Sequence, residues 1–214
     1  MPELIPGAVV VIAKVPRPGR VKTRLSPPLT AEQACEVAWA CLTDTLAAAA
    51  AVPSRRHVLL LDGEAGPWTP PDFEVIGQRG EGLGDRLAAG FADVADDAVV
   101  IAMDTPQVGG ERLAVALGAL QHGYDSVLGP ATDGGYWLIG LRAAVEAGSV
   151  FDGVPMSTSG TGAAQHERLR HLGLSTLVLD ELQDVDTIDD VWTVGAAHRP
   201  SRLGRLTESW RTRR

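Results

Sequence analysis

The chain has 214 residues, of which 45% are hydrophobic and 21% charged, the composition of a globular protein with room for one sizeable α/β domain. Its formal net charge of -8 argues against nucleic acid as a partner. No apolar run approaches the roughly 20 residues that span a bilayer, and the N-terminus lacks a signal-peptide pattern, so we expect a cytoplasmic protein without a membrane span.

Strand-like apolar runs alternate with helical patterns along most of the chain. Thr30, with Gln33 three residues later, forms a capping box that predicts the start of a long Ala-rich helix. Strands are expected from residues 7, 57, 73, 98, 125, 136 and 174, and further helices at 85–95, 111–121, 165–171 and after Thr187. The alternation predicts a single-domain, doubly wound α/β sheet that is mostly parallel. The run at 136–141 breaks the alternation and points to a mixed sheet.

The two cysteines are expected to be reduced. Cys35 and Cys41 lie in the same predicted helix, about 9 Å apart along its axis, which is too far for a disulfide, so we expect two reduced core residues.

The last sixteen residues contain six arginines and one acid, Glu208. We therefore divide the chain into a domain at 1–198 and an Arg-rich, loosely held tail at 199–214.

A basic loop follows the first predicted strand. Lys14 and Lys22, which both fall in the stretch AKVPRPGRVKTRL, are the chain's two lysines, and no acid occurs between Leu4 and Ala31. A lysine ammonium is a compact charge that suits a phosphate group. Gly19 would let the backbone approach a ligand closely, and Lys22 and Arg24 would neutralise phosphate oxygens. The loop therefore predicts a small anionic ligand, with Lys14 also assigned to nucleotide binding, and the alternative is a solubilising loop.

Acidic residues follow later strands at the same predicted sheet edge. Asp104 is expected at the last position of a buried strand, in MDTPQV, and Mg²⁺ is usually bound by one or two carboxylates together with substrate phosphates. Asp186, in DELQDVDTIDD, is the best candidate for a second ligand of Mg²⁺ or Mn²⁺, and Asp184 is the next. The alternative for Asp104 is a carboxylate that only accepts hydrogen bonds from the following turn.

Two Gly-rich segments complete the candidate site. In PATDGGYWLIGL, Asp133 is a candidate to orient an acceptor hydroxyl or to act as a base, although a tight turn explains it equally well. The residues assigned to this acceptor side are Asp133, Gly134, Gly135 and Tyr136. GQRGEGLGDRL is a flexible loop leading into a helix, where backbone amides are expected to contact a nucleotide base or ribose. The residues assigned there are Gln78, Gly82 and Gly84.

Taken in order, these segments, together with PMSTSGTG and LQDVDTIDDV, resemble a bacterial family of small glycosyltransferase-A-like proteins. Some of its members are assigned as arsenosugar biosynthesis glycosyltransferases, and its relatives include phospholactate and molybdenum-cofactor guanylyltransferases. The resemblance implies the nucleotide-diphospho-sugar transferase (GT-A-like) fold. It also implies that Gly19, Lys22 and Arg24 hold nucleotide phosphates, and that Asp104 and Asp186 hold Mg²⁺.

The function implied is that of an Mg²⁺-dependent transferase that uses a nucleotide-sugar to modify a small-molecule acceptor. Lys22, Asp104 and Asp133 would be its catalytic residues. The first alternative is a guanylyltransferase-like nucleotidyltransferase that releases pyrophosphate, and the second is a nucleotide-binding protein without catalysis. The chain departs from the related glycosyltransferases in having D-T-P, with one carboxylate, where many have D-x-D.

Overall fold

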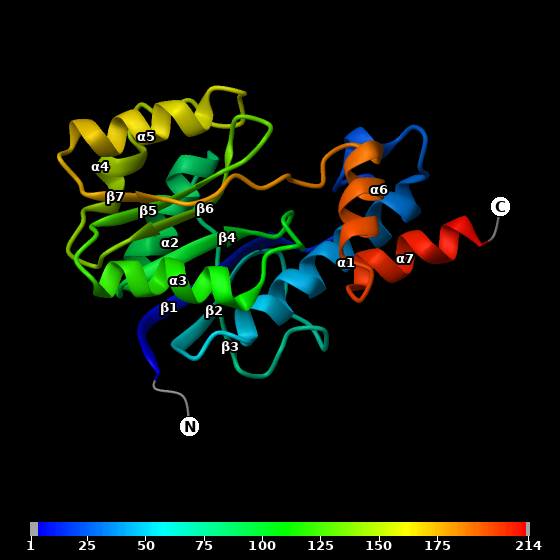
Figure 1. Cartoon of the computed structure of the whole chain (residues 1–214), viewed down its shortest axis with the longest axis horizontal. Helices are drawn as coiled ribbons and strands as arrows, with labels where there is room; N and C mark the ends of the chain where they lie inside the picture. The colour runs from blue at the N-terminus through cyan, green and yellow to red at the C-terminus, as the bar shows by residue number, and fades with distance from the viewer. Residues whose placement is uncertain (1–3, 213–214) are drawn as a thin grey trace.

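The computed structural model describes residues 4–212, which form a seven-stranded sheet flanked by helices (Figure 1). The strands are β1 (Ile5–Lys14), β2 (Ser54–Asp62), β3 (Phe73–Gly77), β4 (Ala98–Ala102), β5 (Ser126–Pro130), β6 (Tyr136–Leu141) and β7 (Thr176–Val178). The helices are α1 (Ala31–Ala50), α2 (Leu83–Val94), α3 (Gly110–Gln121), α4 (Ala147–Phe151), α5 (Thr161–His171), α6 (Ile188–Ala197) and α7 (Arg202–Arg211). None of the helices in this part of the chain combines the length and apolarity needed to cross a membrane.

The strands lie in the order β3-β2-β1-β4-β6-β5-β7. All neighbours run parallel except β6, which is antiparallel to both β4 and β5. This confirms the mixed sheet expected from the strand at 136–141. Gly140 stands opposite Val99 in this part of the sheet, and a Cβ there would lie 2.8 Å from a Val99 methyl group, so only glycine fits.

Each face of the sheet is covered by helices that bury their apolar side chains against it. On one face, α1 and α3 pack on alternate strand residues such as Val9 and Ile101. On the other face, α2, α4 and α5 pack on residues such as Val10 and Val100. The predicted capping box of Thr30 is present at the start of α1, and both cysteines of that helix are buried and free. The β4 strand is therefore buried on both sides, and its carboxyl end meets that of β1 at one edge.

The Arg-rich segment differs from the expected loose tail, because it folds as α7 and packs against α1 and α6 (Figure 1). Leu203, Leu206 and Trp210 recur at helical spacing and contribute to a third apolar cluster beyond the sheet. Leu203 is 1% exposed, and Asp44 of α1 accepts hydrogen bonds from the first backbone amides of α7. Arg202, Arg205 and Arg211 occupy the exposed side of this amphipathic helix, and the last two arginines of the segment lie outside the described residues. The domain boundary at residue 198 stays a prediction.

Replacing Leu203 by alanine is expected to lower the free energy of unfolding by about 2–4 kcal/mol, because it leaves a cavity between α1, α6 and α7. Urea denaturation at constant m value measures the change. Glu208→Ala on the exposed side of the same helix is the control and should change stability by less than about 0.5 kcal/mol. Equal, small effects of the two substitutions would show that α7 is not docked.

Candidate active site

The basic loop leaves β1 at the carboxyl edge of the sheet and contains a single 3₁₀ turn, Thr23–Leu25, which the sequence did not predict. Leu25 anchors this turn because its side chain is completely buried in the third apolar cluster. Lys22 precedes the turn in a left-handed backbone conformation, with φ at 48°. Left-handed backbone is uncommon for residues other than glycine, so Lys22 has an unusual backbone conformation at the start of this turn.

The ammonium group of Lys22 lies inside the molecule and joins two distant segments. Its Nζ lies 2.9 Å from Oδ1 of Asp104 and also donates a hydrogen bond to the carbonyl of Val185. The Lys22 side chain is 5% exposed, whereas that of Asp104 is 38% exposed. Burial lowers the pKa of Lys22 and is the largest single effect, but the nearby acids, Asp104 first and Asp186 after it, contribute to a net increase, and the pKa is raised. Lys22 is therefore charged at neutral pH.

A second ion pair lies beside the first. The Arg24 guanidinium contacts a carboxylate oxygen of Asp186, so the basic loop is held to the acidic segment at two points. The Arg24 side chain is mostly exposed and Asp186 is partly buried. The backbone continues the contact, because the Val185 amide donates to the Asp104 carbonyl at 3.0 Å. These contacts bring together the three segments that the sequence proposed for phosphate and metal.

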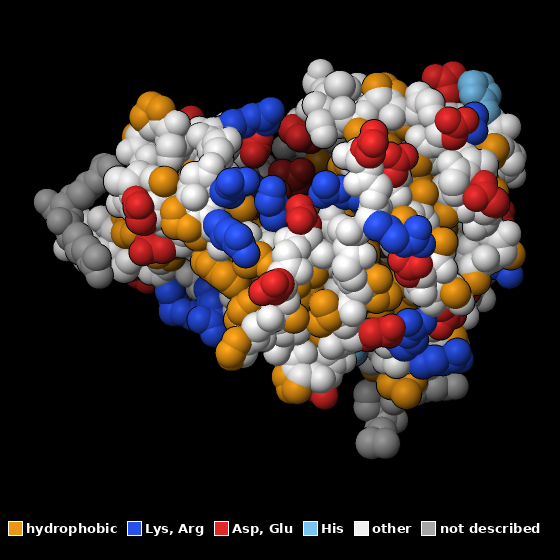
Figure 2. Space-filling view, turned by 180° about the vertical axis from the view of Figure 1, so that it is seen from behind, with side chains coloured by type: hydrophobic (Ala, Val, Ile, Leu, Met, Phe, Trp, Pro, Cys, Tyr) orange, Lys and Arg blue, Asp and Glu red, His pale blue; other side chains and the backbone are white. Residues whose placement is uncertain are grey.

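A cavity of about 280 Å³ lies between the basic loop and these acids. Its charged lining residues are Lys14, Arg20, Lys22, Arg24, Asp104 and Asp186. The surface shows a hollow with acidic side chains on its floor and basic side chains along its rim (Figure 2). A cavity with both signs of charge suits a ligand that carries phosphate groups together with a divalent cation.

Two details of the acidic segments differ from the sequence-based expectation. β4 ends at Ala102, so Asp104 lies in the turn after the strand instead of at its last position. Asp184, which the sequence ranked behind Asp186, accepts a hydrogen bond of 2.9 Å from the buried Thr105 hydroxyl. Burial raises the pKa of Asp184 to about 7, and the carboxylates of Asp104 and Asp133 add to the increase. Asp184 thus belongs to the same group of acids.

The Asp133 loop runs along the segment that carries Asp184. The Asp133 carboxylate accepts a hydrogen bond of 2.8 Å from the Gly135 amide, which is the tight turn considered as the alternative. The residue itself is exposed at the sheet edge. Tyr136, assigned to the acceptor side, points its hydroxyl toward the Met156 sulfur at 3.7 Å, and burial raises its pKa. An acceptor role for these residues stays a prediction.

Gly134 packs directly against the backbone of Ser159. It has a φ of +87°, and a Cβ at this position would lie 1.9 Å from the Ser159 carbonyl oxygen. Gly134→Ala is therefore expected to lower the free energy of unfolding by about 1–3 kcal/mol, measured by urea denaturation. The control is Gly118→Ala in α3, where a Cβ meets no atom within 4 Å and where alanine should stabilise the helix by about 0.5–1 kcal/mol. Equal stability of the two variants would contradict this packing.

The remaining predicted nucleotide ligands are near the same edge but are already engaged within the protein. Lys14 lines the cavity, is 50% exposed, and lies 4.0 Å from Asp62. The Gln78 amide donates to the carbonyls of Ala13 in β1 and Leu60 in β2, which favours a structural role. Nucleotide contacts by these residues stay predictions.

The glycines assigned to nucleotide binding have different surroundings. Gly82 precedes α2, and Gly84 lies in its first turn against Met156. Gly19 has a φ of +72°, and a Cβ there would meet no atom within 4 Å. The backbone at Gly19 is therefore open to a ligand, but a nucleotide contact by any of the three stays a prediction.

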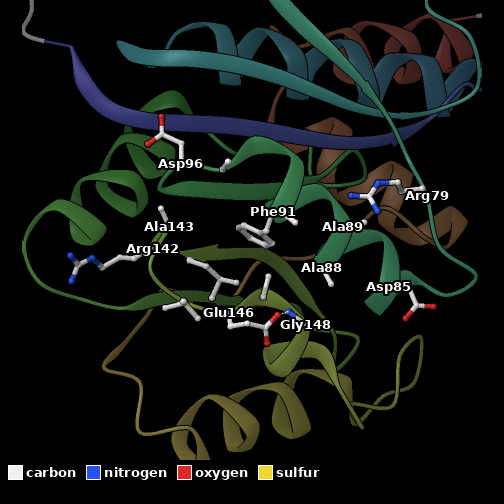
Figure 3. Close-up of a pocket in the computed structure, with 15 residues that line it drawn as sticks. Arg79, Asp85, Ala88, Ala89, Phe91, Asp96, Arg142, Ala143, Glu146 and Gly148 are labelled. Carbon is white, nitrogen blue, oxygen red and sulfur yellow. Dashed lines mark hydrogen bonds between the residues drawn. The ribbon is translucent and has the colours of Figure 1, made fainter.

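A larger cavity of about 560 Å³ lies elsewhere, along α2 and the loop that leads into α4 (Figure 3). Alanines and the ring of Phe91 form much of its wall, while Arg79, Asp96 and Arg142 lie around its rim. None of the sequence-predicted site residues lines it. The candidate site is therefore the smaller cavity, which contains the charged residues predicted from the sequence, and not the larger one.

The fold corresponds to that of known structures. A crystal structure from Desulfovibrio desulfuricans G20, provisionally described as a nucleotide-diphospho-sugar transferase, is 28% identical, with 97% of this chain and 95% of that chain covered and a TM-score of 0.85. The 2-C-methyl-D-erythritol 4-phosphate cytidylyltransferase of Thermus thermophilus is 16% identical over 90% and 98% of the chains, with a TM-score of 0.58. CMP:2-keto-3-deoxy-manno-octonic acid synthetase, solved with CTP, is 13% identical over 90% and 98%, with a TM-score of 0.54.

These likenesses confirm the nucleotide-diphospho-sugar transferase fold and place the chain in the GT-A-like superfamily of nucleotidyl and sugar transferases. Within it, the chain belongs to the family described as "Uncharacterized protein conserved in bacteria (DUF2064)", whose model matches residues 33–158. The comparison with curated proteins found no match. The basic loop lies before the matched residues and the Asp184–Asp186 segment after them, so the family model covers only part of the charged cavity.

Proposed function

We propose that this chain is a divalent-metal-dependent transferase that binds a nucleotide or nucleotide-sugar in the charged cavity, in the cytoplasm. The observation that carries the proposal is the meeting of Lys22 and Arg24 with Asp104 and Asp186 at the carboxyl edge of β1 and β4. In open α/β sheets this edge is where ligands bind. Lys22 and Arg24 would hold phosphate oxygens, and the acids would hold the cation.

The donor set fits Mg²⁺ or Mn²⁺ that binds together with a phosphate ligand. Asp104, Asp184 and Asp186 offer hard carboxylate oxygens, yet no group of three or more ligating side chains among residues 4–212 is arranged to hold a metal on its own. Mg²⁺ is usually held by one or two carboxylates with phosphate oxygens and water completing the shell. When bound, the cation supplies positive charge that stabilises a departing phosphate group.

The favoured reaction is sugar transfer from a nucleotide-sugar to a small-molecule acceptor. In this reaction the bond between the sugar and the diphosphate breaks, and Lys22 and Arg24 stabilise the departing nucleoside diphosphate. Asp133 would orient the acceptor hydroxyl or take its proton. The likeness over nearly the whole chain to a protein described as a nucleotide-diphospho-sugar transferase supports this version.

The second candidate is nucleotidyl transfer, in which pyrophosphate leaves and Lys22 stabilises charge on the α-phosphate. The single carboxylate of the D-T-P turn, in place of D-x-D, weakens the case for sugar transfer and fits this candidate about as well, and the similarity in fold to two cytidylyltransferase-type enzymes also supports this candidate. Both reactions use the same phosphate-binding groups, so the site geometry supports them equally.

Analysis of the leaving group separates the two reactions. The purified protein is incubated with Mg²⁺, a panel of nucleoside triphosphates and nucleotide-sugars, and a pool of candidate acceptors, and the products are resolved by ³¹P NMR. Release of nucleoside diphosphate supports sugar transfer, and release of pyrophosphate supports nucleotidyl transfer. Nucleotide binding without either product would support the alternative of a binding protein without catalysis.

A further inference from the structure

We propose that the Lys22 ammonium acts as the resident cation of the metal site in the ligand-free protein, so that the divalent metal and the phosphate ligand bind in a mutually dependent way. The inference rests on the proposed function, because it takes the charged cavity as the site of both ligands. It assigns Lys22 two alternative partners, the Asp104 carboxylate and the phosphate of a bound ligand.

Lys22 and a divalent metal would compete for the Asp104 carboxylate. Lys22 Nζ lies 2.9 Å from Oδ1 of Asp104, which is direct contact, and a metal coordinated by the same oxygen would lie about 2.0–2.6 Å from it. An ammonium and a divalent ion at such short distances from one oxygen repel each other strongly. Lys22 must therefore give up Oδ1 before a metal can bind that oxygen, and its positive charge disfavours a metal on the other carboxylate oxygen while the ion pair is intact.

The other contacts of Lys22 hold its ammonium group in place beside Asp104. The side chain is 5% exposed and its Nζ also donates to the Val185 carbonyl, so the ammonium depends on protein groups more than on solvent for its hydrogen bonds. A buried charge that loses its partner carries a large desolvation penalty. Metal alone would impose that penalty, whereas a phosphate group arriving with the metal gives the ammonium a new anionic partner.

The Arg24–Asp186 pair repeats the arrangement at the cavity rim. Here too a base of the loop is joined to an acid that is a candidate ligand of the metal. Binding of a metal–phosphate complex would break both internal ion pairs. The acids of these pairs would then contact the metal, and the bases would contact the phosphate. By thermodynamic linkage, each ligand then raises the affinity for the other, with couplings of about 5–150-fold being typical.

The test measures Mn²⁺ binding without any nucleotide, by the electron paramagnetic resonance signal of free Mn²⁺. The wild-type protein is expected to bind Mn²⁺ with a dissociation constant above about 0.1 mM. Lys22→Met, a neutral side chain of similar length, is expected to bind it about tenfold more tightly. Lys14→Met removes one positive charge from the same cavity and should change the affinity by less than about threefold, because Lys14 faces Asp62. Adding Asp104→Asn to Lys22→Met should abolish the gain.

Tight Mn²⁺ binding by the wild-type protein, or no gain in Lys22→Met, would overturn the proposal. Circular dichroism establishes whether the Lys22→Met variant is folded. If it is not, Lys22→Gln takes its place. If neither variant folds, the affinity of the wild-type protein for Mn²⁺ alone decides the proposal. None of these measurements requires turnover. A protein that shows the Lys22 effect but transfers no group would refute the proposed function alone, and active enzyme without the effect would refute this inference alone.

Discussion

Asp104→Asn is expected to lower kcat/KM of the transfer reaction by about 10²–10³-fold while leaving the protein folded. Asparagine keeps the shape of the side chain and a hydrogen-bond acceptor for Lys22, but it lacks the negative charge that would hold a divalent cation in the cavity. The partial exposure of Asp104 limits the cost of the change to folding. Initial rates of product release, measured at saturating Mg²⁺, determine the loss.

The matched control for this variant is Asp93→Asn. Asp93 forms an ion pair with Arg79 on the surface, away from the charged cavity, so its loss should change kcat/KM by less than about twofold. An activity that is indifferent to Asp104→Asn would contradict the metal-binding role. Nucleotide binding without any turnover, in the wild-type protein as well as in the variant, would favour a nucleotide-binding protein without catalysis.

Lys22→Ala is expected to weaken nucleotide binding by about 10- to 100-fold, whereas Lys14→Ala should weaken it by about threefold or less. Lys22 is buried where its charge-assisted hydrogen bonds are strong, because solvent does not screen them. Lys14 is half-exposed and only loosely paired with Asp62, so its contribution is screened by water and salt.

Calorimetric titration of the same nucleotide into both variants and into wild-type protein, with Mg²⁺ present, measures this difference. Thermal unfolding of each variant separates a local loss of affinity from a loss of folded protein. Equal losses of affinity in the two variants would refute the ordering and would mean that the loop acts only through its total charge.

Local sequence signals predicted most of the fold. The capping box at Thr30 placed the start of α1, and the run at 136–141 indicated the strand that turns out to be antiparallel. The segment from 202 to 211 was missed as a helix because its arginines suggested a solvated tail, while Leu203, Leu206 and Trp210 already showed helical spacing. A test of periodicity that ignored composition would have found α7.

The contacts within the candidate site were less accessible from sequence. The residue types of Lys22 and Asp104 indicated phosphate and metal, but their direct ion pair depends on the left-handed backbone at Lys22 and on a turn after β4. The inward position of Asp184 depends on the path of an irregular segment. In such a segment, no strand or helix periodicity predicts the direction of a side chain. The hydrogen bond from the buried Thr105, which lies far away in the sequence, explains why Asp184 faces the other acids.

The central claim is that the charged cavity binds a nucleotide through Lys22 and a divalent cation through Asp104. The most direct test is a thermal-shift screen of nucleoside triphosphates and diphospho-sugars against the wild-type protein, Lys22→Met and Asp104→Asn, each with and without Mg²⁺. We predict that at least one nucleotide raises the Tm of the wild-type protein, that Mg²⁺ enlarges the shift, and that both variants lose the enlargement. A shift that is equal in all three proteins, or no shift with any nucleotide, would contradict the claim.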